Sequence, residues 1–331
     1  MASKHNSRLS YETPRCQRGT EFALYAQAPL SLYSLMKMIF ACLLACFPVV
    51  AAFCADGTII PAGEKVKLLA GDFVFTEGPA SDALGNVFFT DQPNDRILKW
   101  STDGQLSTWL QPAGRANGLI FDKEGYLWAC ADEKNELWKI SPEKKVAVVL
   151  KDFEGKLFNG PNDIWIHPGG AVFFTDPYYK RNYWKRGAKE MGEFVYRLDP
   201  GTSKPVRVIE DLKQPNGIIG TSDGKLLYVA DIGAGKTYRY QVKPHGALAD
   251  KHLFCELGSD GMTIDDQGNV YLTGKGVSVY SPEGKRVEQI DVPEGWTANV
   301  CFGGKDRSTL FITASKGLYS IRTLVKGAGS Q

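Results

Sequence analysis

One short pattern recurs six times along this 331-residue chain, and it constrains the fold more than any other feature. Each copy opens with a polar residue, runs into a short apolar strand, turns, and returns as a second strand rich in aromatic and β-branched residues. Units of about 40 to 45 residues that each hold four strands are typical of β-propeller blades. The copies start at Glu77, Asn117, Asn162, Asn216, Asp260 and Asn299, in steps of 40, 45, 54, 44 and 39 residues.

The repeats predict an all-β protein, a six-bladed β-propeller over residues 56–325, followed by a short tail at 326–331. A strand over 65–69 precedes the first unit, and we expect it to form the outer edge of the last blade and so close the ring. Two stacked β-sandwiches are the structural alternative. Sandwiches do not repeat one motif at even spacing, so the pattern favours the propeller.

The first 55 residues read as a leader that precedes the fold. Lys37 lies just before an unbroken apolar run over 39–53, and small residues follow the run, as in a secretory signal peptide. Translation is then expected to begin at Met36 or Met38, and the mature protein to be periplasmic or secreted with no stable membrane span. An uncleaved membrane anchor is the alternative, although the run is short for a bilayer.

Charge and cysteine content exclude several classes of function. The formal net charge is only +2, and no run of basic residues suggests a face for nucleic acid. Cys130, Cys255 and Cys301 are the cysteines that remain after the leader. They are too few and too far apart for a disulfide framework or a C-x-x-C metal site, and we interpret them as small buried apolar residues.

The six polar residues that open the units are the strongest candidates for a functional site. Inner strands of a propeller run in the same direction, so these residues are expected at one mouth of the central channel. Two carboxylates and several amides, with no His or Cys, favour one divalent ion: calcium first, then magnesium or manganese, with zinc less favoured. The alternative is that these residues only form turns or bind neighbouring backbone.

The motifs in these units resemble those of the senescence-marker-protein, gluconolactonase and luciferin-regenerating-enzyme family. The resemblance covers residues 65–322 and rests on six motifs in the first five units: Glu77-Gly-Pro, Arg115-Ala-Asn117-Gly-Leu, Pro161-Asn162-Asp163, Phe174-Thr-Asp-Pro177, Pro215-Asn216-Gly and Ser259-Asp260-Gly-Met. It implies a six-bladed propeller that hydrolyses sugar lactones or related esters with a bound divalent ion. It also implies that Glu77, Asn162, Asn216 and Asp260 hold the ion, and that Arg115 and Asn117 contact substrate hydroxyls.

A mechanism follows as a hypothesis. A metal ion would polarise the lactone carbonyl, and Asp260 would act as the general base for the attacking water. Direct attack by Asp260 on the substrate is a second possibility. Asn299, which opens the sixth unit, is expected to contact substrate. A non-catalytic propeller that binds a ligand or protein, and a phosphotriesterase-like hydrolase, are the alternative functions.

Three other groups of residues carry weaker signals. The histidines of the repeat region, His167, His245 and His252, pair with no serine in the pattern, so a Ser-His-Asp triad is not expected. The aspartates that end successive second strands are interpreted as turn or blade-packing residues: Asp91, Asp132, Asp176 and Asp231. The aromatic residues of the longest insertion could form a lid, a pocket wall or an ordinary packed loop: Tyr178, Tyr179, Tyr183 and Trp184.

Overall fold

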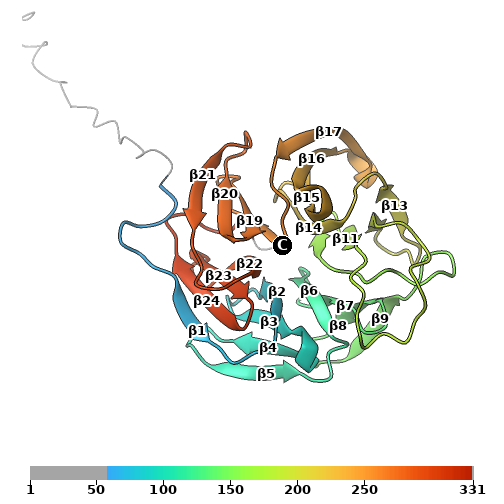
Figure 1. The fold of residues 1–331 in the computed structure, drawn as a ribbon, viewed down its shortest axis with the longest axis horizontal. Coiled ribbons are helices and arrows are strands. Elements are labelled where there is room, and N and C mark those ends of the chain that lie inside the picture. The colour runs from blue at the N-terminus through green and yellow to red at the C-terminus, as the bar shows by residue number, and fades with distance from the viewer. Residues whose placement is uncertain (1–57, 330–331) are drawn as a thin grey trace, which may run out of the picture. The chain divides into compact units, whose positions relative to one another are not determined.

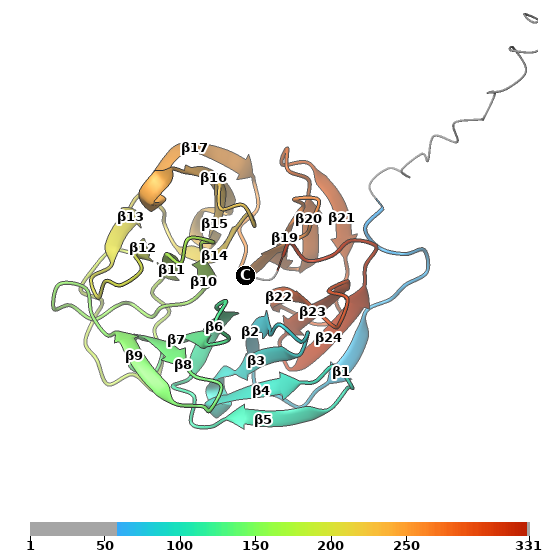
Figure 2. The same ribbon diagram turned by 180° about the vertical axis from the view of Figure 1, so that it is seen from behind.

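The computed structural model describes residues 58–329, which form six four-stranded antiparallel sheets arranged around a central axis (Figure 1). The first strands of neighbouring blades contact one another all the way around the ring. Strands such as β2, β6, β14 and β22 lie nearest the centre in both views (Figure 2). The predicted six-bladed β-propeller is therefore confirmed.

In the first three blades the strands follow one another from the axis outward. Blade 1 contains β2 (Thr76–Ser81), β3 (Val87–Asp91), β4 (Arg96–Trp100) and β5 (Leu106–Leu110). Blade 2 contains β6 (Ala116–Phe121), β7 (Leu127–Ala131), β8 (Glu136–Ile140) and β9 (Val146–Leu150). Blade 3 contains β10 (Ile164–Ile166), β11 (Val172–Asp176), β12 (Phe194–Leu198) and β13 (Val206–Ile209).

The other three blades repeat this order, except at the outer edge of the last. Blade 4 contains β14 (Pro215–Gly220), β15 (Leu226–Asp231), β16 (Lys236–Val242) and β17 (Leu248–Cys255). Blade 5 contains β18 (Met262–Ile264), β19 (Val270–Gly274), β20 (Gly276–Tyr280) and β21 (Arg286–Ile290). Blade 6 contains β22 (Thr297–Gly303), β23 (Thr309–Ala314), β24 (Gly317–Arg322) and, outermost, β1 (Lys67–Ala70).

The ring is closed by a strand from the opposite end of the described chain. β1 pairs antiparallel with β24, with Lys67 opposite Ser320 and Leu68 opposite Tyr319. This pairing confirms the prediction that the strand before the first repeat completes the last blade. It covers the edge of β24 that would otherwise expose unpaired backbone groups.

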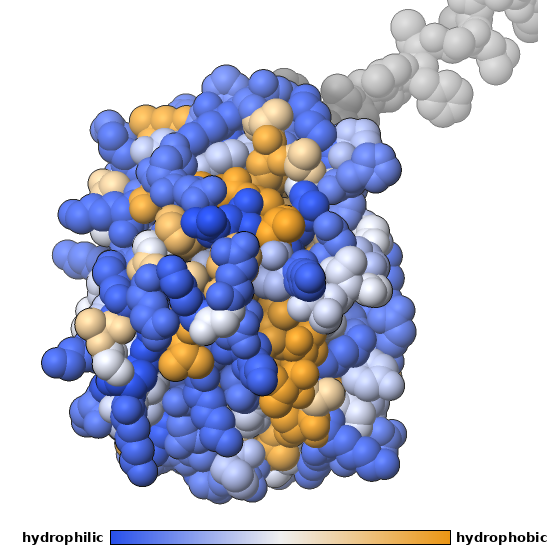
Figure 3. Space-filling model, turned by 90° about the vertical axis from the view of Figure 1, so that its right-hand side faces the viewer, coloured by the Kyte–Doolittle hydropathy of each residue, from blue (hydrophilic) through white to orange (hydrophobic). Residues whose placement is uncertain are grey.

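The second strand of each blade is the most apolar because it is covered on both faces by neighbouring blades. All five residues of β3 and of β11, both Val-Phe-Phe-Thr-Asp, are buried. Between blades 2 and 3, the rings of Phe174 and Tyr196 stack with centroids 5.3 Å apart. The outer strands are more exposed to solvent: β9 exposes Val146 and Val148. The face in Figure 3 is largely hydrophilic, with a band of apolar groups running across it.

Three aspartates at the ends of second strands fix the chain where it enters the inner strand of the same blade. Asp91 accepts hydrogen bonds from the backbone N–H groups of residues 74 and 75, Asp176 from those of 159 and 160, and Asp231 from those of 213 and 214. These contacts agree with the turn role among the two that were expected, turn or blade packing. Asp132, at the same place in blade 2, does not follow this pattern.

The leader and signal assigned to residues 1–55, with the start at Met36 or Met38, lie outside the described residues. Within residues 58–329, no helix is long and apolar enough to cross a membrane. Cys130 and Cys255 are buried and Cys301 is half-buried, and all three are unpaired.

Candidate active site

The structure brings together three of the four residues predicted to hold a metal. Glu77 lies in β2, Asn216 in β14, and Asp260 just before β18. The Asn216 side chain donates from Nδ2 to Oδ1 of Asp260 at 2.8 Å. The charge of Asp260 acts on Glu77, so two carboxylates from blades 1 and 5 share one site.

Both carboxylates are in surroundings that disfavour negative charge. Burial raises the pKa of Glu77 well above its usual value of 4.5, and the negative charges of Asp260 and Asp163 raise it further. Burial also raises the pKa of Asp260, although the hydrogen bonds that its carboxylate accepts from Trp296 and Asn216 lower it in part. A cation bound between these two buried carboxylates would stabilise their negative charges.

The side-chain amide of Asn216 presents its oxygen to the site. Its Nδ2 donates both to Asp260 and to the hydroxyl of Tyr179, which is 2.9 Å away. Its Oδ1 is buried and has no hydrogen-bond partner within residues 58–329. A buried carbonyl oxygen beside two carboxylates is a donor suited to a hard cation.

The donor set also limits the kind of metal that would fit. Among residues 58–329, no group of three or more His, Cys, Asp or Glu side chains is placed to hold a metal ion. A metal between Glu77 and Asp260 would therefore need amide oxygens as well as carboxylates. Such all-oxygen surroundings fit calcium, magnesium or manganese better than zinc.

Asn162 and Asn117 help to bring neighbouring blades together. Both are buried, and the backbone carbonyl of Asn162 accepts a hydrogen bond from Gly118 N at 2.7 Å. A Cβ atom on Gly78 would lie only 2.0 Å from the carbonyl oxygen of Asn117, so glycine is required there. The two asparagines thus lie where blades 1, 2 and 3 meet most closely.

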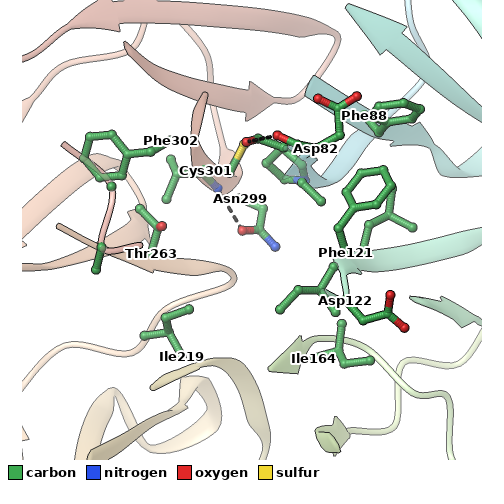
Figure 4. Close-up of a pocket in the computed structure, with 18 of the residues that line it drawn as sticks. Asp82, Phe88, Phe121, Asp122, Ile164, Ile219, Thr263, Asn299, Cys301 and Phe302 are labelled. Carbon is green, nitrogen blue, oxygen red and sulfur yellow. Dashed lines mark hydrogen bonds between the residues drawn. The ribbon is translucent and has the colours of Figure 1, made fainter. Parts of the chain in front are cut away.

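Two residues predicted to bind substrate have different surroundings: the Asn299 side-chain amide packs against Gly261, the residue after Asp260, whereas Arg115 packs against Tyr183. Asn299 lines a cavity of about 630 Å³ formed by the later parts of the inner strands and the turns that follow them (Figure 4). None of Glu77, Asn216 and Asp260 lines that cavity. Arg115 packs its guanidinium 4.6 Å from the centre of the Tyr183 ring and donates to the backbone carbonyl of Pro93.

Residues 75–316 match the region shared by SMP-30, gluconolactonase and LRE-like proteins. The chain belongs to this family. Its resemblance to the family, drawn from the motifs, is thereby confirmed.

Relatives within the gluconolactonase family cover most of the propeller. A gluconolactonase from Zymomonas mobilis is 30% identical over 301 residues, which is 81% of this chain and 84% of the relative. A pentonolactonase from Haloferax volcanii is 26% identical over 211 residues, 60% of this chain and 67% of the relative. The solved structure of a gluconolactonase from Xanthomonas campestris superposes with a TM-score of 0.74, at 26% identity over 79% of this chain and 90% of that one.

In this gluconolactonase-family site, the repeat pattern missed Trp296 and Arg181, whereas Tyr179 was named from the sequence as a possible lid or pocket-wall residue. Trp296 donates from Nε1 to Oδ2 of Asp260 at 2.7 Å, Tyr179 accepts from Asn216, and the positive charge of Arg181 acts on both Glu77 and Asp260. Tyr179 and Arg181 lie in the long connection between β11 and β12, whose aromatic content was a usable signal. Trp296 precedes β22 outside the repeated motif, and no pattern marks it.

Proposed function

We propose that this protein hydrolyses a sugar lactone of the gluconolactone type, with one divalent metal ion. The observation that carries the proposal is the convergence of Glu77, Asp260 and the unpartnered Oδ1 of Asn216 in one site. Relatives named gluconolactonase and pentonolactonase support the substrate class. The residues proposed to hold the ion are Glu77, Asn162, Asn216 and Asp260, with calcium favoured over manganese, magnesium and zinc.

When bound, such an ion would polarise the ester carbonyl and stabilise negative charge on its oxygen. The protein's own contribution centres on Asp260, whose two oxygens are held by different donors, Asn216 Nδ2 and Trp296 Nε1. A carboxylate fixed in this way can take a proton from a water that attacks the carbonyl carbon. Water adds to that carbon, the ring C–O bond breaks, and the proton passes to the leaving ring oxygen to give the open hydroxy acid.

Substrate recognition belongs to the same proposal. Asn117 and Arg115 are proposed to contact sugar hydroxyls, as the family resemblance implies. The Tyr183 ring against the Arg115 guanidinium would let the two side chains form part of one wall. Asn299, whose side-chain amide packs against Gly261 beside Asp260, is proposed to contact the lactone as well.

Export from the cytoplasm completes the proposal. The apolar run over 39–53 supports a periplasmic or secreted enzyme that meets lactones outside the cell. N-terminal sequencing of protein recovered from the periplasm or the medium is expected to show a start after residue 50. A start at Ala2 would contradict it.

The test of function is hydrolysis of glucono-1,5-lactone by the purified protein, stripped of metal and resupplied with calcium, manganese, magnesium or zinc in turn. We expect activity to vanish with chelator and to return with one of these ions. If no ion gives hydrolysis of this lactone or of a panel of other lactones, the propeller is a binding module instead.

A further inference from the structure

Asp132 departs from the role that its counterparts have in three other blades. Asp91, Asp176 and Asp231 each bind backbone N–H groups at the entry to their own inner strand. In blade 2 that task falls to Asp95, whose Oδ1 accepts from the backbone N–H groups of residues 113 and 115 at 2.9 and 2.7 Å. The carboxylate of Asp132 is therefore available for other partners.

Those partners lie mostly in the connection between β11 and β12, residues 177–193. Oδ2 of Asp132 accepts from Arg181 Nε at 2.9 Å and from the Tyr183 hydroxyl, and also from Gln92 Nε2 at 3.3 Å. Its backbone carbonyl accepts from Trp184 Nε1 at 2.7 Å. The Asp132 side chain is only 4% exposed, so solvent screens these charge-assisted bonds little.

The backbone around Asp132 is shaped to admit this connection. Gly160 has a φ of +152°, and a Cβ atom there would lie 2.6 Å from Oδ1 of Asp132 and 3.1 Å from the Trp184 ring. Any larger residue would push the carboxylate or the indole away. Arg115 covers the Tyr183 ring from blade 2 and adds a further contact between the blade and the connection.

The same connection reaches the candidate active site two residues before Arg181. The Tyr179 hydroxyl accepts a hydrogen bond from Asn216, and the Arg181 guanidinium lies 5.6 Å from the centre of the Tyr179 ring. Arg181 also carries the positive charge that acts on Glu77 and Asp260. The contacts that hold Arg181 in place therefore hold Tyr179 in place as well.

We infer that Asp132 is a positioning residue that clamps the β11–β12 connection to blade 2 and so places Tyr179 and Arg181 beside Asn216 and Asp260. The clamp makes Tyr179 a fixed aromatic wall of the site. A fixed aromatic wall favours ring-shaped ligands because their faces can pack against it without ordering the connection first. The clamp follows from the contacts alone, whereas its effect on turnover rests on the proposed lactonase function.

The test compares Asp132→Asn with the wild type and with Asp265→Asn. Asp265 is a matched control: it is buried in the turn between β18 and β19 and accepts bonds from Asn269 and Tyr271, far along the chain from the connection. The first readout is limited trypsin digestion, because the connection holds five cleavage positions: Lys180, Arg181, Lys185, Arg186 and Lys189. The second readout is KM and kcat for glucono-1,5-lactone.

We expect Asp132→Asn to speed cleavage within 180–189 by about tenfold or more, since proteolysis follows the population of the opened segment. KM should rise about fivefold or more with a smaller change in kcat, as expected when binding rather than chemistry loses support. Asp265→Asn should lower thermal stability without either change. Cleavage of the connection at the wild-type rate in folded Asp132→Asn would overturn the clamp.

Tyr183→Phe keeps the test decisive if Asp132→Asn fails to fold. This variant removes one hydroxyl donor and keeps the ring under Arg115, so it should accelerate cleavage of the connection to a smaller extent. An unchanged cleavage rate in Tyr183→Phe would then overturn the inference. If the wild type hydrolyses no lactone, the proteolysis result still decides the clamp, and only the proposed function fails.

Discussion

The Nδ2 of Asn216 lies 2.8 Å from Oδ1 of Asp260, and the Asn216 carbonyl oxygen has no hydrogen-bond partner among residues 58–329. An amide whose nitrogen is occupied by two acceptors can offer only its oxygen to a ligand. The pair therefore presents one amide oxygen and one carboxylate from adjacent blades, with Glu77 as the second carboxylate. This arrangement leads to the first three predictions.

Asp260→Asn is expected to reduce kcat for lactone hydrolysis by about a thousandfold or more, because the amide cannot take a proton from water. The variant keeps the size of the side chain and can still accept from Trp296, so the fold should persist. Steady-state kinetics and circular dichroism check both parts. Turnover at the wild-type level would show that Asp260 is not the base.

Trp296→Phe tests whether the hydrogen bond from Trp296 is needed to hold the Asp260 carboxylate in place. It removes the Nε1 donor to Oδ2, a hydrogen bond to a charged group, for which a loss of about 2 kcal/mol and hence a fall of about tenfold or more in kcat/KM is expected. Trp296 is 39% exposed, so the melting temperature should change little. A variant with unchanged kcat/KM would show that this donor has no part in catalysis.

Calcium should stabilise the folded protein if the oxygen donors hold an ion. At about a hundredfold excess over Kd, binding to the folded state alone adds about 2.7 kcal/mol, which raises Tm by about 5 °C in a domain of this size. Differential scanning calorimetry of the metal-free protein with and without calcium measures the shift. Glu77→Gln should lose it, and retention of the full shift in that variant would place the ion elsewhere.

Gly78 is required by the close approach of blades 1 and 2. Its φ is +39°, and a Cβ atom would lie 2.0 Å from the Asn117 carbonyl oxygen. Gly78→Ala should therefore lower the free energy of unfolding by about 3 kcal/mol or more, from backbone strain and overpacking together. Urea unfolding measures this effect.

Gly155→Ala provides the matched control for that variant. Gly155 also has a positive φ, +81°, but no atom lies within 4 Å of a Cβ added there. It should lose only about 1 kcal/mol, from the backbone conformation alone. An equal decrease in the free energy of unfolding in the two variants would show that a Cβ atom close to the Asn117 carbonyl does not destabilise the protein.

Asp176 should make stability depend on pH in a definite direction. Burial raises the pKa of Asp176 from 3.8 to about 7, so the folded protein holds a proton that the unfolded chain releases above pH 4. The contribution of Asp176 is fully present below pH 4 and is lost as the pH rises to about 7, by up to about 1.4 kcal/mol per pH unit. Urea unfolding from pH 4 to 8, compared with Asp176→Asn, isolates it; parallel curves would contradict the shift.

The architecture could be predicted from the sequence because every blade of a propeller has the same strand pattern, which therefore recurs along the chain. Each blade has an apolar second strand that is buried on both faces. The sequence Val-Phe-Phe-Thr-Asp, which occurs in both β3 and β11, shows this requirement directly. The strand before the first repeat had no partner within its own unit, which pointed to closure with the last blade. The polar starts of the units likewise placed Glu77, Asn216 and Asp260 at one site.

The sequence by itself thus determined the fold, its closure and the carboxylates of the site, whereas the tertiary structure decided what surrounds them. Tyr179 and Asn216 are 37 residues apart, and Asp260 and Trp296 are 36 apart. Asn299 opens its unit like the others, and the tertiary structure places its side-chain amide against Gly261, the residue after Asp260. The repeated pattern specifies the register and burial of the strands within a blade. Contacts made by the non-repeated connections depend on how the backbone runs from one blade to another, and the pattern of a single blade contains no information about that path.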